Sequence, residues 1–363
     1  MKIFDGHIHL DSDSAHFAAP AAEAEGAERW ALLSLSQHHD DPVQNLAVLL
    51  AKALSPDRCF GFFGLDHPVH GRSVPDPLDQ VKTWRAAGFD GLKLIETKPN
   101  CQKATGVRLD EARFDPMFDY LEREQIPVLW HNGDPATFWD PKLCPAFAVE
   151  NGWSYVDGTF LPLSELYSIV ERVLDRHPLL KVTFAHFYFV SDDPAHAERM
   201  MERYPNVRFD ITPGSEMYGG FSDNPEFFRP FFLRYADRIQ LGTDTLITAA
   251  PHPPVIEGDA RFAGDTMKNI LRFLMTSDEF TPWGVHVKAG FALPEKAVEQ
   301  IVSGTMTSFL GDRPVRIDPD SARRACSATL ERCSGTQVSL ARDLIAEIED
   351  LLREQTGGAG NAE

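Results

Sequence analysis

Two histidines stand one residue apart within the first ten residues, MKIFDGHIHL. Their apolar neighbours Ile3, Phe4 and Ile8 predict a short buried strand, on which residues two apart face the same side. His7 and His9 would therefore project together, and a pair of neutral imidazoles suits a cation better than an apolar core. Taken alone, such a pair is more often buried and hydrogen-bonded than metal-binding, so the interpretation needs partners.

Several later apolar runs also contain, or are directly followed by, a polar residue that could take part in chemistry. These polar residues are Lys93 in GLKL, His131 in VLWHNG, His186 in TFAHF and Asp244 in LGTDT. Imidazole and carboxylate groups in this number are the ligands of zinc or a neighbouring divalent metal. Each also has a plainer interpretation: Asp244 as a turn residue, His131 as the start of a loop, and Lys93 as half of an internal ion pair.

The elements that must position these residues alternate regularly along the chain. Eight apolar runs predict strands, and helical patterns separate them, which favours parallel βα units closed into a (β/α)₈ TIM barrel. The carboxyl ends of such strands meet at one rim, where barrel active sites lie. The predicted strands are Lys2–His9, Trp30–Leu35, Cys59–Leu65, Gly88–Ile95, Ile126–His131, Lys181–His186, Val207–Ile211 and Arg238–Gly242.

Helices are expected between the strands and after the last one. Residues 1–312 are assigned to the barrel with its closing helix, 313–356 to C-terminal helices and 357–363 to a disordered tail, GGAGNAE. The predicted helices are Ala15–Ala27, Pro42–Leu54, Pro75–Ala87, Asp115–Gln125, Leu163–His177, Pro194–Tyr204, Pro225–Tyr235, Asp265–Thr276, Pro294–Leu310, Pro319–Cys333 and Ser339–Glu354.

The ordered set of strand-end residues, with the segments LKVTFAH, NVRFDIT, IQLGTD and VEQIVSGTMTSFLG, resembles the amidohydrolase superfamily. Within it the chain looks most like the amidohydrolase-related (amidohydrolase 2) metal-dependent hydrolases, over roughly residues 1–310. The resemblance implies that His7, His9, His131 and Asp244 hold one divalent metal ion, most simply zinc, with manganese, iron or cobalt as alternatives.

The resemblance also implies roles for the remaining groups. Asp244 would accept a proton from the attacking water, and His186 would polarise a carbonyl or orient that water. Lys93 occupies the place of a carbamylated, metal-bridging lysine in two-metal relatives. With one metal it becomes a contact to substrate or to a ligand. On the same rim, His67, His70 and Trp139 are candidate substrate-binding residues, although loop aromatics more often pack a loop onto its barrel.

The expected activity is metal-dependent hydrolysis of a C–N or C–O bond in a small carbonyl compound. The alternative is a metal-dependent non-oxidative decarboxylase of a small aromatic or unsaturated acid, since the resembled family includes such enzymes. Decarboxylases there often follow the strand-8 aspartate with an aromatic residue or proline, whereas Thr245 and Leu246 follow Asp244 here. A third interpretation is a non-catalytic binding protein, which would be expected to have lost a ligand position.

Composition excludes several other classes. The formal net charge of -19 disfavours nucleic acid or an anionic membrane surface as a partner. The 5 cysteines form no CxxC pair, which indicates reduced thiols and a cytoplasmic location. Asp5, His7, His9 and Asp11 do not suit a signal peptide, and no apolar run is long enough to span a bilayer. A small-molecule substrate is the expected partner.

The last predicted helix carries an apolar stripe at Leu340, Leu344, Ile348 and Leu351, which lie at helical spacing. We expect this stripe to pack on the barrel or on a second copy, and a homodimer is the expected assembly. Light scattering at low micromolar concentration checks this. A monomer whose mass per particle matches one chain would contradict the dimer.

Overall fold

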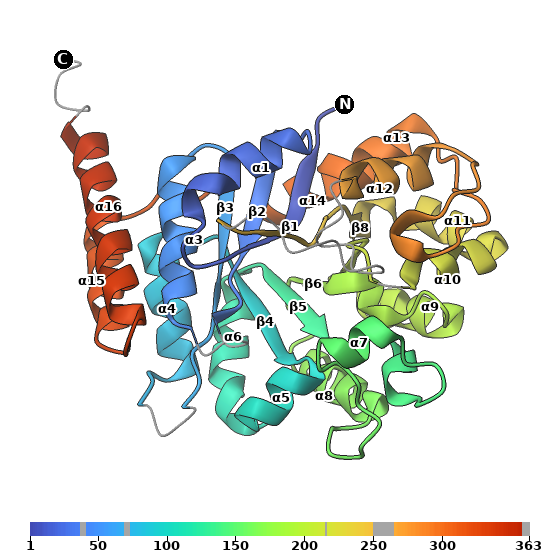
Figure 1. Ribbon diagram of the computed structural model, residues 1–363, viewed down its shortest axis with the longest axis horizontal. Coiled ribbons are helices and arrows are strands. Elements are labelled where there is room, and N and C mark those ends of the chain that lie inside the picture. Colours follow the sequence, from blue (N-terminus) through green and yellow to red (C-terminus); the bar gives the residue numbers. More distant parts are fainter. Residues whose placement is uncertain (37–40, 69–72, 215, 250–264, 358–363) are drawn as a thin grey trace.

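The computed structural model describes residues 1–36, 41–68, 73–214, 216–249 and 265–357. Strands occupy the middle of the molecule and helices lie around them, as Figure 1 shows. The strands are β1 (Phe4–Leu10), β2 (Arg29–Leu33), β3 (Cys59–Gly64), β4 (Gly91–Thr97), β5 (Val128–Asn132), β6 (Val182–Phe184), β7 (Val207–Asp210), β8 (Ile239–Gln240) and β9 (Thr245–Ile247). All eight predicted strands are confirmed, within a few residues at their ends.

Every strand pair in this sheet is parallel, in the order β8-β7-β6-β5-β4-β3-β2-β1-β9. The two ends of that order, β8 and β9, belong to one stretch of chain, residues 239–247. Its first part pairs with β7 and its last part with β1, so the sheet returns to its own first strand. The predicted (β/α)₈ TIM barrel is confirmed, with an eighth strand that is interrupted in the middle.

The barrel closes where β1 meets residues 239–247, and this seam is held by backbone and side-chain contacts. Gly6 N–H donates to the carbonyl of Leu241 at 3.0 Å, and Asp244 N–H donates to the carbonyl of His7 at 2.8 Å. The buried carboxyl of Asp5 accepts hydrogen bonds from the Thr243 N–H at 3.1 Å and hydroxyl at 2.7 Å. Gly242 allows the close approach, because a Cβ there would lie 2.6 Å from the Cβ of His7.

The helices confirm most of the predicted boundaries, and α5, α7 and α10 are short additions in the loops. The helices are α1 (Ala18–Ala24), α3 (Val43–Leu54), α4 (Pro77–Ala87), α5 (Pro99–Thr105), α6 (Asp115–Arg123), α7 (Ala146–Glu150), α8 (Leu163–Arg176), α9 (Pro194–Arg203), α10 (Met217–Asp223), α11 (Pro225–Arg234), α12 (Thr266–Met275), α13 (Glu295–Glu299), α14 (Thr305–Leu310), α15 (Pro319–Leu330) and α16 (Gln337–Gly357). None of the helices in the described part of the chain is long and apolar enough for a membrane crossing.

Strand β6 ends at Phe184, two residues before the predicted end at His186. From His186 to Phe189 every φ is positive, between 52° and 59°, so the chain makes a left-handed turn without glycine. Such a conformation costs about 1–2 kcal/mol per residue and must be held by its surroundings. The Phe187 ring supplies part of that support, since it packs 4.8 Å from Phe209 and 4.7 Å from Phe221.

The C-terminal helices α15 and α16 lie side by side at one end of the molecule, next to α4 and α3 (Figure 1). The chain leading to them is tied to the barrel, because Val315 N–H donates to the buried Asp90 carboxylate at 2.7 Å. That carboxylate also pairs with buried Lys52 of α3. The extension therefore packs directly against the barrel's own helices.

The apolar stripe of α16 faces α3 within the same chain. Leu344 and Ile348 are buried as predicted, whereas Leu340 and Leu351 are only half-buried. Ala341 and Leu352 complete the buried face, one residue further along at each end. A straight α-helix repeats every 3.6 residues, so the face drifts relative to the predicted register. The stripe is thus occupied intramolecularly, and the homodimer stays a prediction.

Two isoleucines of α16 provide a matched test of this packing. Ile348 is 1 % exposed and Ile345 is half-buried on the neighbouring face. Ile348→Ala should lower the free energy of unfolding by about 2–4 kcal/mol, because the lost methyl groups leave a cavity against α3. Ile345→Ala should cost less than about 1 kcal/mol. Urea titration of both variants measures this, and equal losses would contradict the described register.

Candidate metal centre

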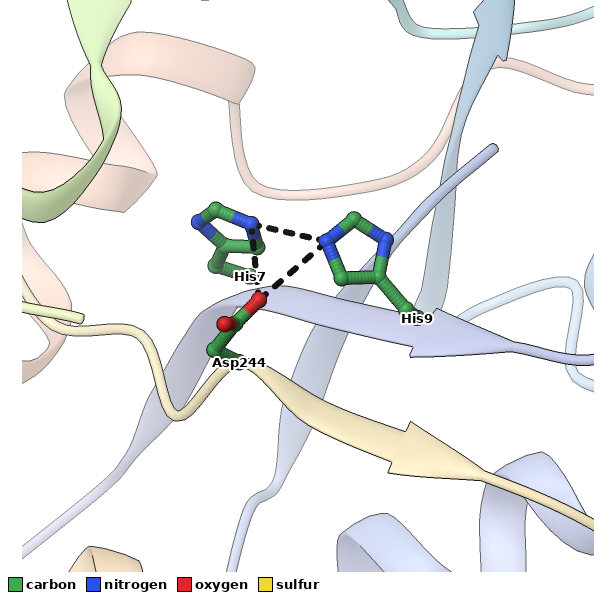
Figure 2. A group of neighbouring side chains, drawn as sticks. All are labelled: His7, His9 and Asp244. Carbon is green, nitrogen blue, oxygen red and sulfur yellow. Dashed lines mark hydrogen bonds and ion pairs between the residues drawn. The ribbon is translucent and has the colours of Figure 1, made fainter. Parts of the chain in front are cut away.

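Three side chains converge where β1 meets residues 239–247, as Figure 2 shows for His7, His9 and Asp244. The Nε2 atoms of His7 and His9 lie 3.0 Å apart. Asp244 Oδ1 lies 3.4 Å from the first and 3.2 Å from the second. All three side chains are buried, and within the described ranges they form the one group of histidine, cysteine and acidic side chains with metal-ligand spacing.

The outer nitrogens of both imidazoles have partners that define the ring tautomers. His7 Nδ1 lies 2.8 Å from the carboxylate of Asp210, and His9 Nδ1 lies 2.7 Å from the carbonyl oxygen of Leu33. A carboxylate and a carbonyl accept hydrogen bonds, so each Nδ1 carries the proton and each Nε2 keeps its lone pair. Both imidazoles therefore present a free electron pair to the same point.

This arrangement fits a small divalent cation. Three electron-pair donors at such distances repel one another unless a positive charge lies among or beside them. Ligand bonds of about 2.0–2.1 Å in tetrahedral geometry place ligand atoms about 3.3 Å apart, which matches the observed spacing of 3.0–3.4 Å. Carboxylate–histidine contacts like that of Asp210 are the usual support of a metal-binding imidazole.

The shifts in pKa place the three groups in their metal-binding forms. Burial lowers the pKa of His7 well below its ordinary value and also lowers that of His9, so both imidazoles are neutral near pH 7. Burial alone would raise the pKa of Asp244, but its contacts with His9, His186 and His7 hold it well below its usual value. Neutral imidazole and ionised carboxylate are the forms that bind a metal.

Lys93 and His186 lie directly beside the group. Lys93 Nζ is 3.3 Å from His7 Nε2, and burial lowers the pKa of this lysine to about 8. The His186 ring lies 5.6 Å from the His7 ring, and its Nδ1 lies 3.3 Å from the carbonyl oxygen of Thr212. Donation from Nδ1 leaves a lone pair on Nε2, with which neutral His186 can accept a hydrogen bond.

His131 lies next to His186 and does not contact His7, His9 or Asp244 in the described contacts. Its ring lies 4.9 Å from the ring of His186, but its Nε2 contacts the carbonyl of Gly133 at 3.0 Å and Asp134 Oδ1 at 3.3 Å. Asp134 also accepts two hydrogen bonds from buried Lys98, at 2.6 and 2.8 Å. The structure therefore places His131 next to the candidate centre, with its Nε2 engaged by its own loop.

The candidate substrate-binding residues have separate surroundings. His67 Nε2 contacts the buried carboxylate of Glu96 at 2.8 Å. Trp139 donates its indole N–H to the carbonyl of Leu161 at 3.1 Å, and its ring packs 4.7 Å from that of Tyr155. The contacts of Trp139 are thus those of an aromatic residue that packs a long loop. His70 lies outside the described residues.

Asp210 is the residue that the sequence-based list of site residues omits. Its side chain is fully buried and touches both His7 and His186. Burial raises its pKa, while the contacts with His186 and Thr212 oppose that rise. The available signal was its position, because Asp210 ends strand β7 just as His131 and Asp244 follow apolar runs in their own segments.

Comparisons with solved structures agree with the fold. Similar chains are an uncharacterized TIM-barrel protein from Bordetella bronchiseptica (15% identity, TM-score 0.52, covering 86% of this chain and 99% of that one), 2,6-dihydroxybenzoate decarboxylase from Rhizobium (13%, 0.51, 85% and 98%) and the IDCase of Metarhizium anisopliae (12%, 0.50, 86% and 97%). At these identities the likeness establishes the fold. No curated protein matches the chain.

A family model described as amidohydrolase matches residues 9–305, which is more than half of the chain. The match begins at His9 and continues past Asp244, so it spans every strand from β2 to β9 and the rim on which these groups lie. The chain belongs to the amidohydrolase family.

Proposed function

We propose that this protein is a metal-dependent hydrolase that cleaves a C–N or C–O bond of a small carbonyl compound. The observation that carries the proposal is the convergence of two imidazole lone pairs and one carboxylate oxygen within 3.0–3.4 Å of one another. His7, His9 and Asp244 would hold one divalent ion, most simply zinc, with manganese, iron or cobalt as alternatives. His131 is proposed as a fourth ligand.

A divalent ion at this position supplies a Lewis acid that lets water act as a nucleophile near neutral pH. The residues around it orient that water and move its proton. Asp244 is buried, ionised and beside the centre, so it can accept the proton and return it to the leaving group. Burial also strengthens each of these electrostatic contacts by excluding bulk water.

His186 and Lys93 are two further groups beside the proposed metal centre, and each has its own role. Neutral His186 offers its Nε2 lone pair to the attacking water, and in its protonated form it donates to the oxygen on which negative charge develops. Lys93, whose pKa lies near 8, places an ammonium group beside His7. That charge suits a substrate with a carbonyl oxygen or a carboxylate near the reacting bond.

A metal-dependent decarboxylase is the alternative to be tested beside hydrolysis. The decarboxylase of Rhizobium shares the fold at a TM-score of 0.51, and its name identifies 2,6-dihydroxybenzoate as its substrate. Thr245 and Leu246 after Asp244 favour hydrolysis. A screen of lactones, amides and aromatic acids separates the two, because ring opening or amide cleavage supports hydrolysis and release of CO₂ supports decarboxylation.

Metal content tests the centre itself. Protein purified without chelator should contain about one divalent ion per chain, and His7→Ala or Asp244→Ala should remove it because the ligands that remain bind the ion weakly. His16→Ala is the control, since His16 is exposed, pairs with Glu347 of α16 and does not belong to the candidate centre. Elemental analysis measures all four proteins. A fully active wild type without metal would refute the proposal.

His186→Asn separates catalysis from metal binding. With one metal, His186 lies beside the centre without binding it, so metal content should stay at the wild-type value. The rate should fall by about 10²–10³-fold, because a positioned hydrogen-bonding group is lost where charge develops. Single-substrate kinetics and elemental analysis on the same preparation give both quantities.

His177→Asn is the matched control for that substitution. His177 is equally buried, but it directly follows α8 and packs against Phe118 of α6, at the end of the helix that precedes β6. This variant should keep both metal content and rate. Loss of metal together with rate in His186→Asn would instead indicate that His186 is a ligand, and an unchanged rate would exclude a catalytic role for it.

A further inference from the structure

One buried carboxylate, Asp210 at the end of β7, connects two imidazoles of the candidate centre. Its Oδ2 lies 2.8 Å from His7 Nδ1, and its Oδ1 accepts the backbone N–H of His186 at 2.7 Å. The same Oδ1 accepts the N–H of Thr212 at 3.2 Å. The side chain is fully buried, so no bulk water competes for these contacts.

We propose that Asp210 is a positioning residue that sets the tautomer of His7 and through it the affinity for the metal. The inference rests on the proposed metal centre and deepens it. Asp210 does not contact the reacting atoms. It acts on them through the imidazole of His7 and through the backbone of His186.

The orientation of the Asp210 carboxylate is determined by the backbone. Two amide N–H groups converge on Oδ1, and a half-turn of the carboxylate would only exchange its two equivalent oxygens. One oxygen therefore always faces His7 Nδ1, where in its ionised form it can accept a hydrogen bond but cannot donate one. The proton of neutral His7 is held on Nδ1, and Nε2 is left free to bind a cation.

The same carboxylate stabilises the left-handed turn that begins at His186. The N–H of His186 belongs to the first of four consecutive residues with positive φ, and its hydrogen bond to Asp210 is made at that first residue. Charge-assisted hydrogen bonds of this kind are about twice as strong as neutral ones. Asp210 thereby couples the placement of the proposed catalytic histidine to that of the proposed ligand.

Asp210→Asn tests the inference with almost no change of shape. The asparagine oxygen must keep facing the two amide N–H groups, which places its NH₂ group against His7 Nδ1. That group donates, so it favours the tautomer with a lone pair on Nδ1 and a proton on Nε2. Because a protonated Nε2 cannot bind a metal, affinity for Zn²⁺ should fall by about 10–100-fold.

Two measurements follow the effect without using activity. Competition with a chromophoric chelator gives the affinity for Zn²⁺. Long-range ¹H–¹⁵N spectra of histidine-labelled, metal-free protein give the tautomer of His7, assigned with His7→Gln. The wild type should show the proton on Nδ1 and Asp210→Asn should show it on Nε2. A wild type with the proton on Nε2 overturns the inference, even if the variant does not fold.

Asp5→Asn is the matched control. Asp5 is equally buried in the barrel and also accepts three hydrogen bonds, but it contacts the backbone N–H of His7 at 3.1 Å and not the imidazole. Its amide can accept from both N–H groups and donate to the Thr243 hydroxyl. Asp5→Asn should therefore keep the wild-type tautomer and affinity. Equal loss of affinity in both variants would show that any disturbance of the barrel interior suffices, and would overturn the specific role of Asp210.

Failure of this inference differs from failure of the proposed function. If the wild type binds no divalent ion, the metal centre is refuted whatever the tautomer of His7. If the wild type binds Zn²⁺ and Asp210→Asn binds it equally well, the centre stands and the role of Asp210 is refuted.

Discussion

The seam at which the barrel closes determines most of what the site can do. One chain segment, residues 239–247, must complete the sheet beside β1 and also deliver Asp244 next to His7 and His9. It does both by breaking in the middle, where Asp244 takes a φ of 58° and its N–H bonds to the carbonyl of His7. The backbone hydrogen bond between Asp244 and His7 therefore helps to close the fold and also holds two of the three candidate ligands next to each other.

The protonation state of each buried ionisable group inside the barrel depends on burial and on its neighbours. Desolvation favours neutral histidines and lowers the pKa of Lys93. The neighbours of Asp244 hold its pKa low, whereas burial raises the pKa of Asp210 against the opposing contacts of His186 and Thr212. A cation among these groups would relieve their mutual repulsion. The interior is thus poorly suited to be an inert polar core, and this supports the proposal of a metal centre more directly than the fold does, since one fold hosts many activities.

Away from the rim, the C-terminal extension is held to the barrel by helix packing and a buried ion pair. The C-terminal helices pack on α3 and α4, and the Asp90–Lys52 pair ties the chain leading to them to the barrel. On the rim itself, the strained turn at His186–Phe189 is held by aromatic packing and by Asp210. Backbone strain of this kind is common at functional sites, where a side chain must be held in one particular orientation.

The sequence by itself determined the barrel, because alternating apolar runs and helical patterns are local signals that survive without tertiary information. It also determined which apolar runs contain or precede the candidate residues, His7, His9, His131, His186 and Asp244. Only the tertiary structure decided how those ends meet. Strand ends on one rim can lie near one another without touching, which is why His7, His9 and Asp244 form one group while the Nε2 of His131 contacts its own loop. The contact between Asp210 and His7 was also inaccessible, since it joins residues about two hundred positions apart, and no local pattern encodes a hydrogen bond across that distance.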